Sequence, residues 1–161
     1  MTKKIYIIFF TGILIFLNGC AGYEPIFSSK KIQFVIEDFL IEGDSTLSKK
    51  IFSKLDNLSK SQKNNQDARS IKININSSKN KTGTNKSSSG KVLEYKITLN
   101  ISVKISDYLT NRMILNKTFI SSTSYKVQDQ YFDTVRLEKT SEENLINNIY
   151  QNLLITLSQN I

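Results

Sequence analysis

The chain has 161 residues, a net charge of +8, one cysteine and no histidine. The single cysteine excludes an internal disulfide, and the absence of histidine excludes histidine-based nucleophile activation, proton shuttling and metal ligation. The positive charge suits an anionic partner such as a lipid headgroup, a phosphorylated glycolipid or a nucleic acid. We expect neither a metal nor a cofactor.

The first 19 residues have the pattern of a secretory signal peptide. Lys3 and Lys4 precede an apolar run at 5–17, which is shorter than the roughly 20 residues needed to span a bilayer. The run leads into Leu17-Asn18-Gly19-Cys20, which resembles the bacterial lipoprotein signal, whose cysteine becomes the lipidated first residue of the mature protein. We therefore predict that Cys20 carries lipid, and an uncleaved membrane anchor is the alternative.

Cleavage before Cys20 divides the chain into three parts. We predict a lipoprotein signal peptide at 1–19, a lipid-anchored tether at 20–31 and a single α+β domain at 32–161. The 142 residues left after cleavage are enough for one domain with a hydrophobic core. They include 20 basic and 14 acidic residues, a net charge of +6. Export beyond the cytoplasm makes nucleic acid the poorest of the anionic partners, and we expect none.

Four segments have strand patterns. Segment 32–41 is rich in β-branched and aromatic residues, with apolar residues on both parities, so we expect both of its faces to be largely covered. Segment 71–75 alternates isoleucine with lysine and asparagine. Segment 93–105 alternates strictly, which predicts a strand of roughly 40 Å with one buried and one wet face. After a turn at 107–111, segment 113–127 returns as its hairpin partner.

Two segments have helical spacing of apolar residues. The first, 45–58, can be capped by Asp44 or Ser45, and we interpret its off-stripe lysines as a solvated face first and a ligand site second. These lysines are Lys49, Lys50 and Lys54. The second runs from about 133 to 158, and we prefer one long helix because no glycine or proline intervenes. A start at the capping-box pattern Thr140-x-x-Glu143 is the alternative.

Between the second and third strand patterns lies a polar run, 77–91, with the sequence SSKNKTGTNKSSSGK. It contains no apolar residue and carries four lysines. We predict a mobile, basic hairpin loop here, and a purely solvated linker is the alternative. The lysines are Lys79, Lys81, Lys86 and Lys91.

The elements follow the order β-α-β-β-β-α. Two amphipathic helices and a sheet with one clearly apolar face predict an α+β two-layer sandwich, in which both helices pack on one face of an approximately four-stranded mixed sheet. We expect the first two strands to run parallel, because a helix connects them, and the last two to form an antiparallel hairpin. The opposite face of the sheet stays polar and available.

The segment that follows the predicted cleavage site resembles a known family. Residues 20–27 read Cys-Ala-Gly-Tyr-Glu-Pro-Ile-Phe, similar to the Cys-Gly-(Phe/Tyr)-x-Pro-(Leu/Ile)-(Tyr/Phe) opening of the lipopolysaccharide (LPS)-assembly lipoproteins of the LptE type. Ala21 is an extra residue before Gly22. The element order, Asp107 at the hairpin turn and Tyr125 after it are also similar to that family.

The resemblance implies a place and a role. Proteins of this family lie on the inner leaflet of the outer membrane, at its periplasmic side, held by lipid on the cysteine. They occupy the lumen of a large β-barrel LPS translocon of the LptD type, help its assembly, plug it and bind LPS. Ala21, rather than aspartate, after the cysteine is similar to lipoproteins sorted to the outer membrane. A multiply acylated Cys20 would anchor the domain stably, whereas one chain would hold it only marginally.

Binding of LPS would require cations for the lipid A phosphates. Arginine suits them best because its guanidinium binds bidentately, and lysine acts as a point charge. The candidates are Lys79, Lys81, Lys86 and Lys91 on the predicted loop and Arg112 near the hairpin turn.

Two other classes of function compete with this reading. A free-standing envelope lipid carrier or binding lipoprotein is the first alternative. A small envelope hydrolase is less favoured, because without histidine only a Ser-Lys or paired-carboxylate site remains and the chain has no Gly-x-Ser-x-Gly elbow. The Glu37-Asp38 pair points to opposite faces of a strand, and we interpret Glu142-Glu143 as complementing a helix dipole. The resemblance carries over no catalytic residue, so we expect no enzyme activity.

Overall fold

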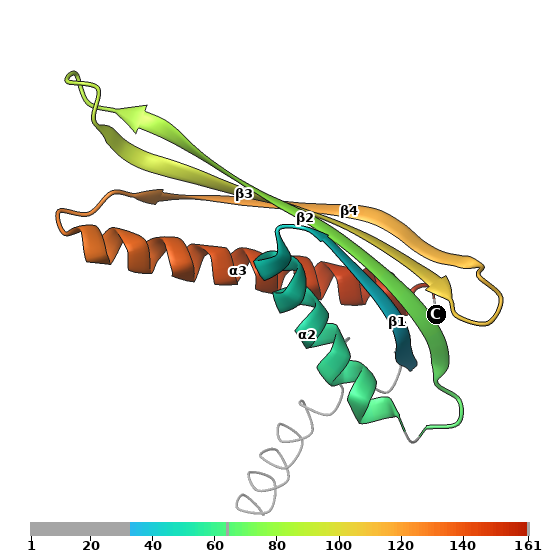
Figure 1. Ribbon diagram of the computed structural model, residues 1–161. Coiled ribbons are helices and arrows are strands. Elements are labelled where there is room, and N and C mark those ends of the chain that lie inside the picture. The colour runs from blue at the N-terminus through green and yellow to red at the C-terminus, as the bar shows by residue number, and fades with distance from the viewer. Residues whose placement is uncertain (1–32, 64, 161) are drawn as a thin grey trace, which may run out of the picture.

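The computed structural model describes residues 33–63 and 65–160 (Figure 1). The predicted signal peptide, Cys20 and the tether lie outside the described residues. The described elements follow the predicted order β-α-β-β-β-α. They are β1 (Phe34–Gly43), α2 (Ser45–Gln62), β2 (Arg69–Lys86), β3 (Val92–Asp107), β4 (Met113–Lys126) and α3 (Tyr131–Ser158). No helix among the described residues is long and apolar enough to cross a membrane.

The four strands form one sheet in the order β1-β2-β3-β4. β1 pairs with β2 in parallel, while β2–β3 and β3–β4 are antiparallel. Both helices lie on the same side of the sheet (Figure 1). The α+β two-layer prediction is therefore confirmed, including the parallel first pair and the final hairpin.

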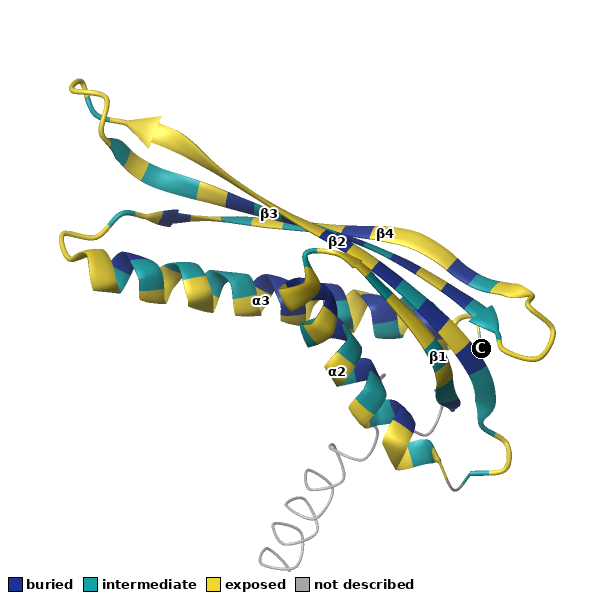
Figure 2. Cartoon of the chain, viewed as in Figure 1, coloured by how far each residue is buried: buried dark blue, intermediate teal, exposed yellow. Residues whose placement is uncertain are grey.

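The hydrophobic core lies between the helices and the half of the sheet where β1 pairs. Alternate residues of β2 and β3 point into it, and the sheet's other face carries mostly exposed or half-buried side chains (Figure 2). Each fully buried Ile or Leu contributes about 1.5–3 kcal/mol relative to an exposed one. The core side chains of these two strands are Ile71, Ile73, Ile75, Ile97, Leu99, Ile101, Val103 and Ile105.

The expectation that β1 is covered on both faces is wrong. The register with β2 shifts between Ile36 and Asp38, so Glu37 is an extra residue in a β-bulge. A bulge reverses the alternation, and Ile36 and Phe39 therefore point to the same face despite their opposite parity. On that face Phe39 contacts Phe52 of α2, with ring centroids 4.2 Å apart. The apolar residues of β1 on both parities thus serve mainly one face.

The predicted mobile loop at 77–91 is also wrong. β2 continues to Lys86 and pairs with β3 as far as Val92, so only residues 87–91 form a turn. Ser77 is fully buried, and its hydroxyl lies 2.8 Å from that of Ser48 on α2. The segment has no apolar side chain, yet it forms a strand because the backbone of β3 supplies hydrogen bonds along its length.

The two helices begin differently, because α2 has a side-chain cap and α3 has none. Asp44 caps α2, because its Oδ1 accepts hydrogen bonds from the backbone N–H groups of Thr46 and Leu47, at 3.0 and 3.2 Å. α3 is one continuous helix from Tyr131, which confirms the preferred long helix and excludes a start at Thr140. Glu142 therefore lies about three turns inside α3, and the interpretation that it complements the helix dipole is wrong.

Candidate functional site

Lys79 and Lys81, two of the predicted LPS-binding lysines, point toward α3 and form ion pairs with it. The Lys79 Nζ lies 2.9 Å from Glu142 Oε2, and Lys81 is paired with Glu138. Their alternation with the core isoleucines of β2 places both ammonium groups on the helix-facing side of the sheet. Two of the four predicted lysines are therefore neutralised by acids of the same chain.

Lys81 lies among aromatic rings as well as beside an acid. Its Nζ is 4.4 Å from the ring centroid of Tyr95, and Tyr125 donates a hydrogen bond of 2.9 Å to the same Glu138 oxygen. Burial disfavours the charged lysine, but hydrogen bonds to Glu138 and Tyr125 outweigh it and raise the pKa of Lys81. Lys81 and its partners Glu138 and Tyr125 therefore connect β2, β4 and α3.

Glu142 is the second acid that connects the layers. Its side chain is 13% exposed and accepts from Lys79 of β2 and from Lys50 of α2, the latter at 3.2 Å. Burial on its own would raise the pKa of Glu142, but the two ammonium groups outweigh it and lower the pKa. Sequence reasoning missed Glu138 and Glu142 as partners. Their spacing of four residues, which places them on one side of a helix, was the available signal.

Lys86 and Lys91 flank the β2–β3 turn and behave differently. Both are exposed, and neither ammonium group has an ion-pair partner among the described residues. Lys91 lines a hollow of about 360 Å³ together with Tyr131 at the start of α3. Tyr131 and Phe132 are 82% and 80% exposed. We call Lys86, Lys91, Tyr131 and Phe132 the distal end, and it combines free cations with exposed aromatic rings.

Arg112 lies far from the distal end. It occupies the β3–β4 turn, whereas Lys86 and Lys91 flank the opposite end of β3. The 16 residues of β3 span about 50 Å at roughly 3.3 Å per residue. Arg112 therefore cannot bind the same phosphate group as Lys91, and the structure divides the predicted basic cluster into three parts: paired lysines, free lysines and a remote arginine.

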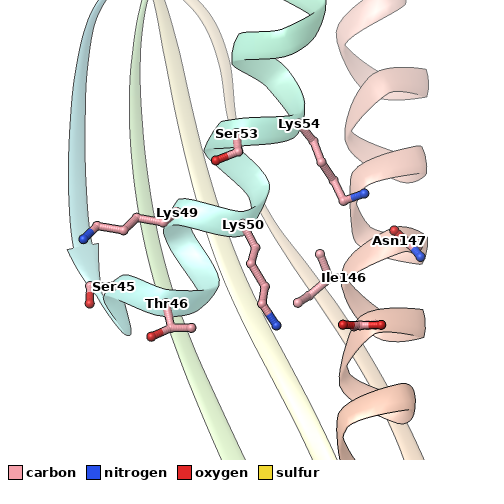
Figure 3. A pocket seen from close by; sticks show the side chains of 9 residues that line it. Ser45, Thr46, Lys49, Lys50, Ser53, Lys54, Ile146 and Asn147 are labelled. Atoms are coloured by element: carbon pink, nitrogen blue, oxygen red, sulfur yellow. The ribbon is translucent and has the colours of Figure 1, made fainter.

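A groove of about 620 Å³ separates α2 from α3 (Figure 3). Lys50 and Lys54 extend from α2 toward α3, while Lys49 points the other way. Lys50 is paired with Glu142, and the Lys54 Nζ lies 5.5 Å from the ring centroid of Tyr150. The groove is also lined by an acid, Glu143. The three lysines and one glutamate leave the lining net positive, and the contacts of Lys50 and Lys54 connect the two helices.

No cluster of metal-ligating side chains is found among the described residues. No group of three or more histidine, cysteine, aspartate or glutamate side chains in this part of the chain could hold a metal ion. Every buried side-chain nitrogen or oxygen described has a hydrogen-bond partner. The described surface does offer charged groups and exposed aromatic rings for recognition.

Two solved structures of bacterial lipoproteins have a similar fold. The uncharacterized lipoprotein B from Nitrosomonas europaea matches with a TM-score of 0.54 at 15% identity, over 76% of this chain and 82% of that one. The minor lipoprotein from Acinetobacter baumannii matches with a TM-score of 0.52 at 17% identity, over 79% and 94%. At such identities the likeness shows a shared fold. No protein-family model and no curated protein matches the chain.

Proposed function

We propose that the chain is an outer-membrane lipoprotein, anchored by acyl chains on Cys20, that occupies and helps to assemble a large β-barrel translocon of the LptD type. In this role it binds LPS and assists its delivery to the cell surface. The fold shared with two bacterial lipoproteins supports the lipoprotein part. The opening motif at residues 20–27 supports the more specific role.

The uncovered face of the sheet is the observation that carries the proposal. Except for Ile120, its central positions on β2, β3 and β4 are polar, and hydroxyls such as Ser102 and Thr118 bond one another across strands at 2.7 Å. β3 alone spans about 50 Å, compared with about 40–45 Å for a bilayer with its headgroups. A polar face of this length suits the wet interior wall of a barrel, with which it can form hydrogen bonds.

The distal end supplies the chemistry for LPS. Lys86 and Lys91 have free ammonium groups for phosphates, and Tyr131 and Phe132 offer exposed rings for apolar chains. Lys79 and Lys81 are less available for this role because Glu142 and Glu138 already pair with them. The chain enters the domain at the opposite end, beside Arg69. The distal end therefore lies about 50 Å from the point of entry, and in this proposal it is directed toward the outer leaflet.

Affinity purification of the full-length protein from detergent-solubilised envelopes tests whether it associates with a β-barrel protein. We expect mass spectrometry to identify one large outer-membrane β-barrel in stoichiometric amount. Recovery of the lipoprotein alone, from membranes in which the barrel is intact, would overturn this part of the proposal and favour the lipid-carrier alternative.

Paired charge removals test the glycolipid site. We expect Lys86→Ala with Lys91→Ala to weaken LPS binding about 10- to 30-fold, because each lysine near an anionic lipid contributes about 1 kcal/mol. Lys63→Ala with Lys104→Ala removes the same charge from exposed positions elsewhere and is the matched control. Equal losses in both double variants would show that only net charge matters and would refute a site at the distal end.

A further inference from the structure

The β3–β4 turn at residues 108–112 is a rigid frame. Asp107 Oδ1 accepts hydrogen bonds from the backbone N–H groups of Leu109 and Thr110 and from the Thr110 hydroxyl, at 3.2, 2.9 and 2.9 Å. Asn111 adopts a left-handed conformation with φ of 56°, and its N–H donates to the Asp107 carbonyl. Arg69 binds the other Asp107 oxygen at 2.8 Å and, with Thr110, holds the pKa of Asp107 well below its usual range.

This fixed turn presents apolar side chains to solvent. Leu109 is 81% exposed at its apex, and Tyr108 and Met113 beside it are about half exposed. A turn whose shape is fixed by its own hydrogen bonds gives up little conformational entropy when its apex binds a partner. A preformed, solvent-exposed leucine flanked by tyrosine and methionine suits an apolar surface, and tyrosine in particular is favoured at membrane interfaces.

The turn lies at the end of the domain where the chain enters. The Arg69 N–H donates to the Gln33 carbonyl at 3.1 Å, and the Tyr108 N–H donates to the Ser70 carbonyl at 3.0 Å. Tyr108 is therefore two strand spacings, about 10 Å, from the first described residue. Cys20 precedes Gln33 by 13 residues, which reach at most about 45 Å. A lipid on Cys20 would hold the turn close to the leaflet and raise its effective concentration there.

The charge of the turn also suits a lipid surface. Arg112 is exposed and has no ion-pair partner among the described residues, so its guanidinium is free for an anionic headgroup. We propose that the β3–β4 turn is a second membrane contact, in which Leu109 inserts into the interface of the phospholipid leaflet that holds Cys20 and Arg112 binds its headgroups. This contact rests on the lipid anchoring in the proposed function and is independent of the barrel.

The chain contains no tryptophan, so one introduced tryptophan reports on one position. We would place it by Leu109→Trp in the full-length protein, reconstituted into vesicles of phosphatidylcholine and phosphatidylglycerol with or without brominated acyl chains. Ile120→Trp on the polar sheet face is the matched control, because both positions are exposed and Ile120 lies away from both turns. Circular dichroism checks that each variant is folded.

We expect the tryptophan at 109 to show a blue-shifted emission and a loss of fluorescence in brominated vesicles, with neither change at 120. Adding Arg112→Gln should reduce the quenching in vesicles with phosphatidylglycerol but not in pure phosphatidylcholine. Quenching at 109 no stronger than at 120 would overturn the contact. The intact mass of the protein reports acylation of Cys20 separately, so an unmodified cysteine would refute the anchoring whatever the fluorescence shows.

Discussion

Replacing Gly43 with alanine would disrupt the point at which β1 turns into α2. Gly43 has a φ of 72°, and a Cβ atom there would lie 2.1 Å from the carbonyl oxygen of Ser77. That same oxygen accepts the Asp44 N–H at 2.8 Å, immediately before α2 begins. Because the obstructing atom belongs to the backbone of β2, a side-chain rotation cannot relieve the clash.

The loss of stability in Gly43→Ala can be estimated from two contributions. A left-handed conformation costs a residue with a Cβ about 1–2 kcal/mol, and loss of the Asp44–Ser77 hydrogen bond costs about 0.5–1.5 kcal/mol. Together these parts lower the free energy of unfolding of Gly43→Ala by about 1.5–3.5 kcal/mol. Gly90 is a matched control, because its φ is 83° and no atom lies within 4 Å of its Cβ position. Gly90→Ala should cost only the conformational part, about 1 kcal/mol.

Urea unfolding of both variants, followed by circular dichroism, measures the difference. The midpoint of Gly43→Ala should fall well below that of Gly90→Ala, with a similar m-value. If the two variants lose the same stability, the close approach of β1 to β2 at Ser77 is incorrect, and the argument about how α2 is positioned fails with it.

The remaining predictions concern α3. Glu142→Gln should lower the free energy of unfolding at pH 7 by about 1–2 kcal/mol, because hydrogen bonds from Lys79 and Lys50 are weakened but partly screened by solvent. Since the pKa of Glu142 is lowered in the folded state, its carboxylate stabilises the fold above about pH 4.3 and this contribution is lost on further acidification. The wild type should therefore lose more stability than the variant between pH 5 and pH 3, and equal losses would contradict the pairing. Leu153→Ala should cost about 2–5 kcal/mol by chemical denaturation, because Leu153 is fully buried. Ile155→Ala, at a position 37% exposed, should cost less than about 1 kcal/mol, and similar costs would show that the face of α3 is misassigned.

The sequence pattern was sufficient where apolar periodicity was strong. β3 alternates over its whole length, and the long apolar stripe of α3 has no internal breaker, so both elements could be predicted with nearly correct ends. The order of elements, the parallel first pair and the placement of both helices on one face followed from them. These features depend on burial, which the spacing of apolar residues reports directly.

The distal half of β2 could not be predicted from apolar spacing because its inward positions are charged. The helix-facing row of β2 starts with Ile71, Ile73 and Ile75 and continues with Lys79 and Lys81. At these two lysines, ion pairs with acids of α3 take the place of apolar core contacts. One signal was available: if a short turn joins β2 to β3, a partner strand for residues 93–105 must extend well beyond residue 75. The bulge at Glu37 gave no comparable signal, because a single inserted residue leaves no mark on composition.

The candidate site could also be predicted only in part from the sequence. Charge alone selected Lys79, Lys81, Lys86, Lys91 and Arg112, but it could not distinguish lysines neutralised across the layers from those left free. Only the register of β2 against α3 separates them. The exposed rings of Tyr131 and Phe132, which accompany the free lysines, have no local pattern in the sequence that marks them as a surface. Their role depends on a tertiary arrangement that local patterns do not contain.

Different interactions hold the two halves of α3 against the sheet: apolar packing in one half and ion pairs in the other. From Leu145 onward, buried apolar side chains hold the helix, so this half is part of the hydrophobic core. Before Leu145, the Glu138 and Glu142 ion pairs provide much of the attachment, and such contacts weaken with rising ionic strength. The attachment of this half therefore depends on salt in a way that the attachment of the other half does not. The protein has an apolar, tightly packed base near its point of entry and, at the far end, an arm whose contact with the sheet is largely electrostatic.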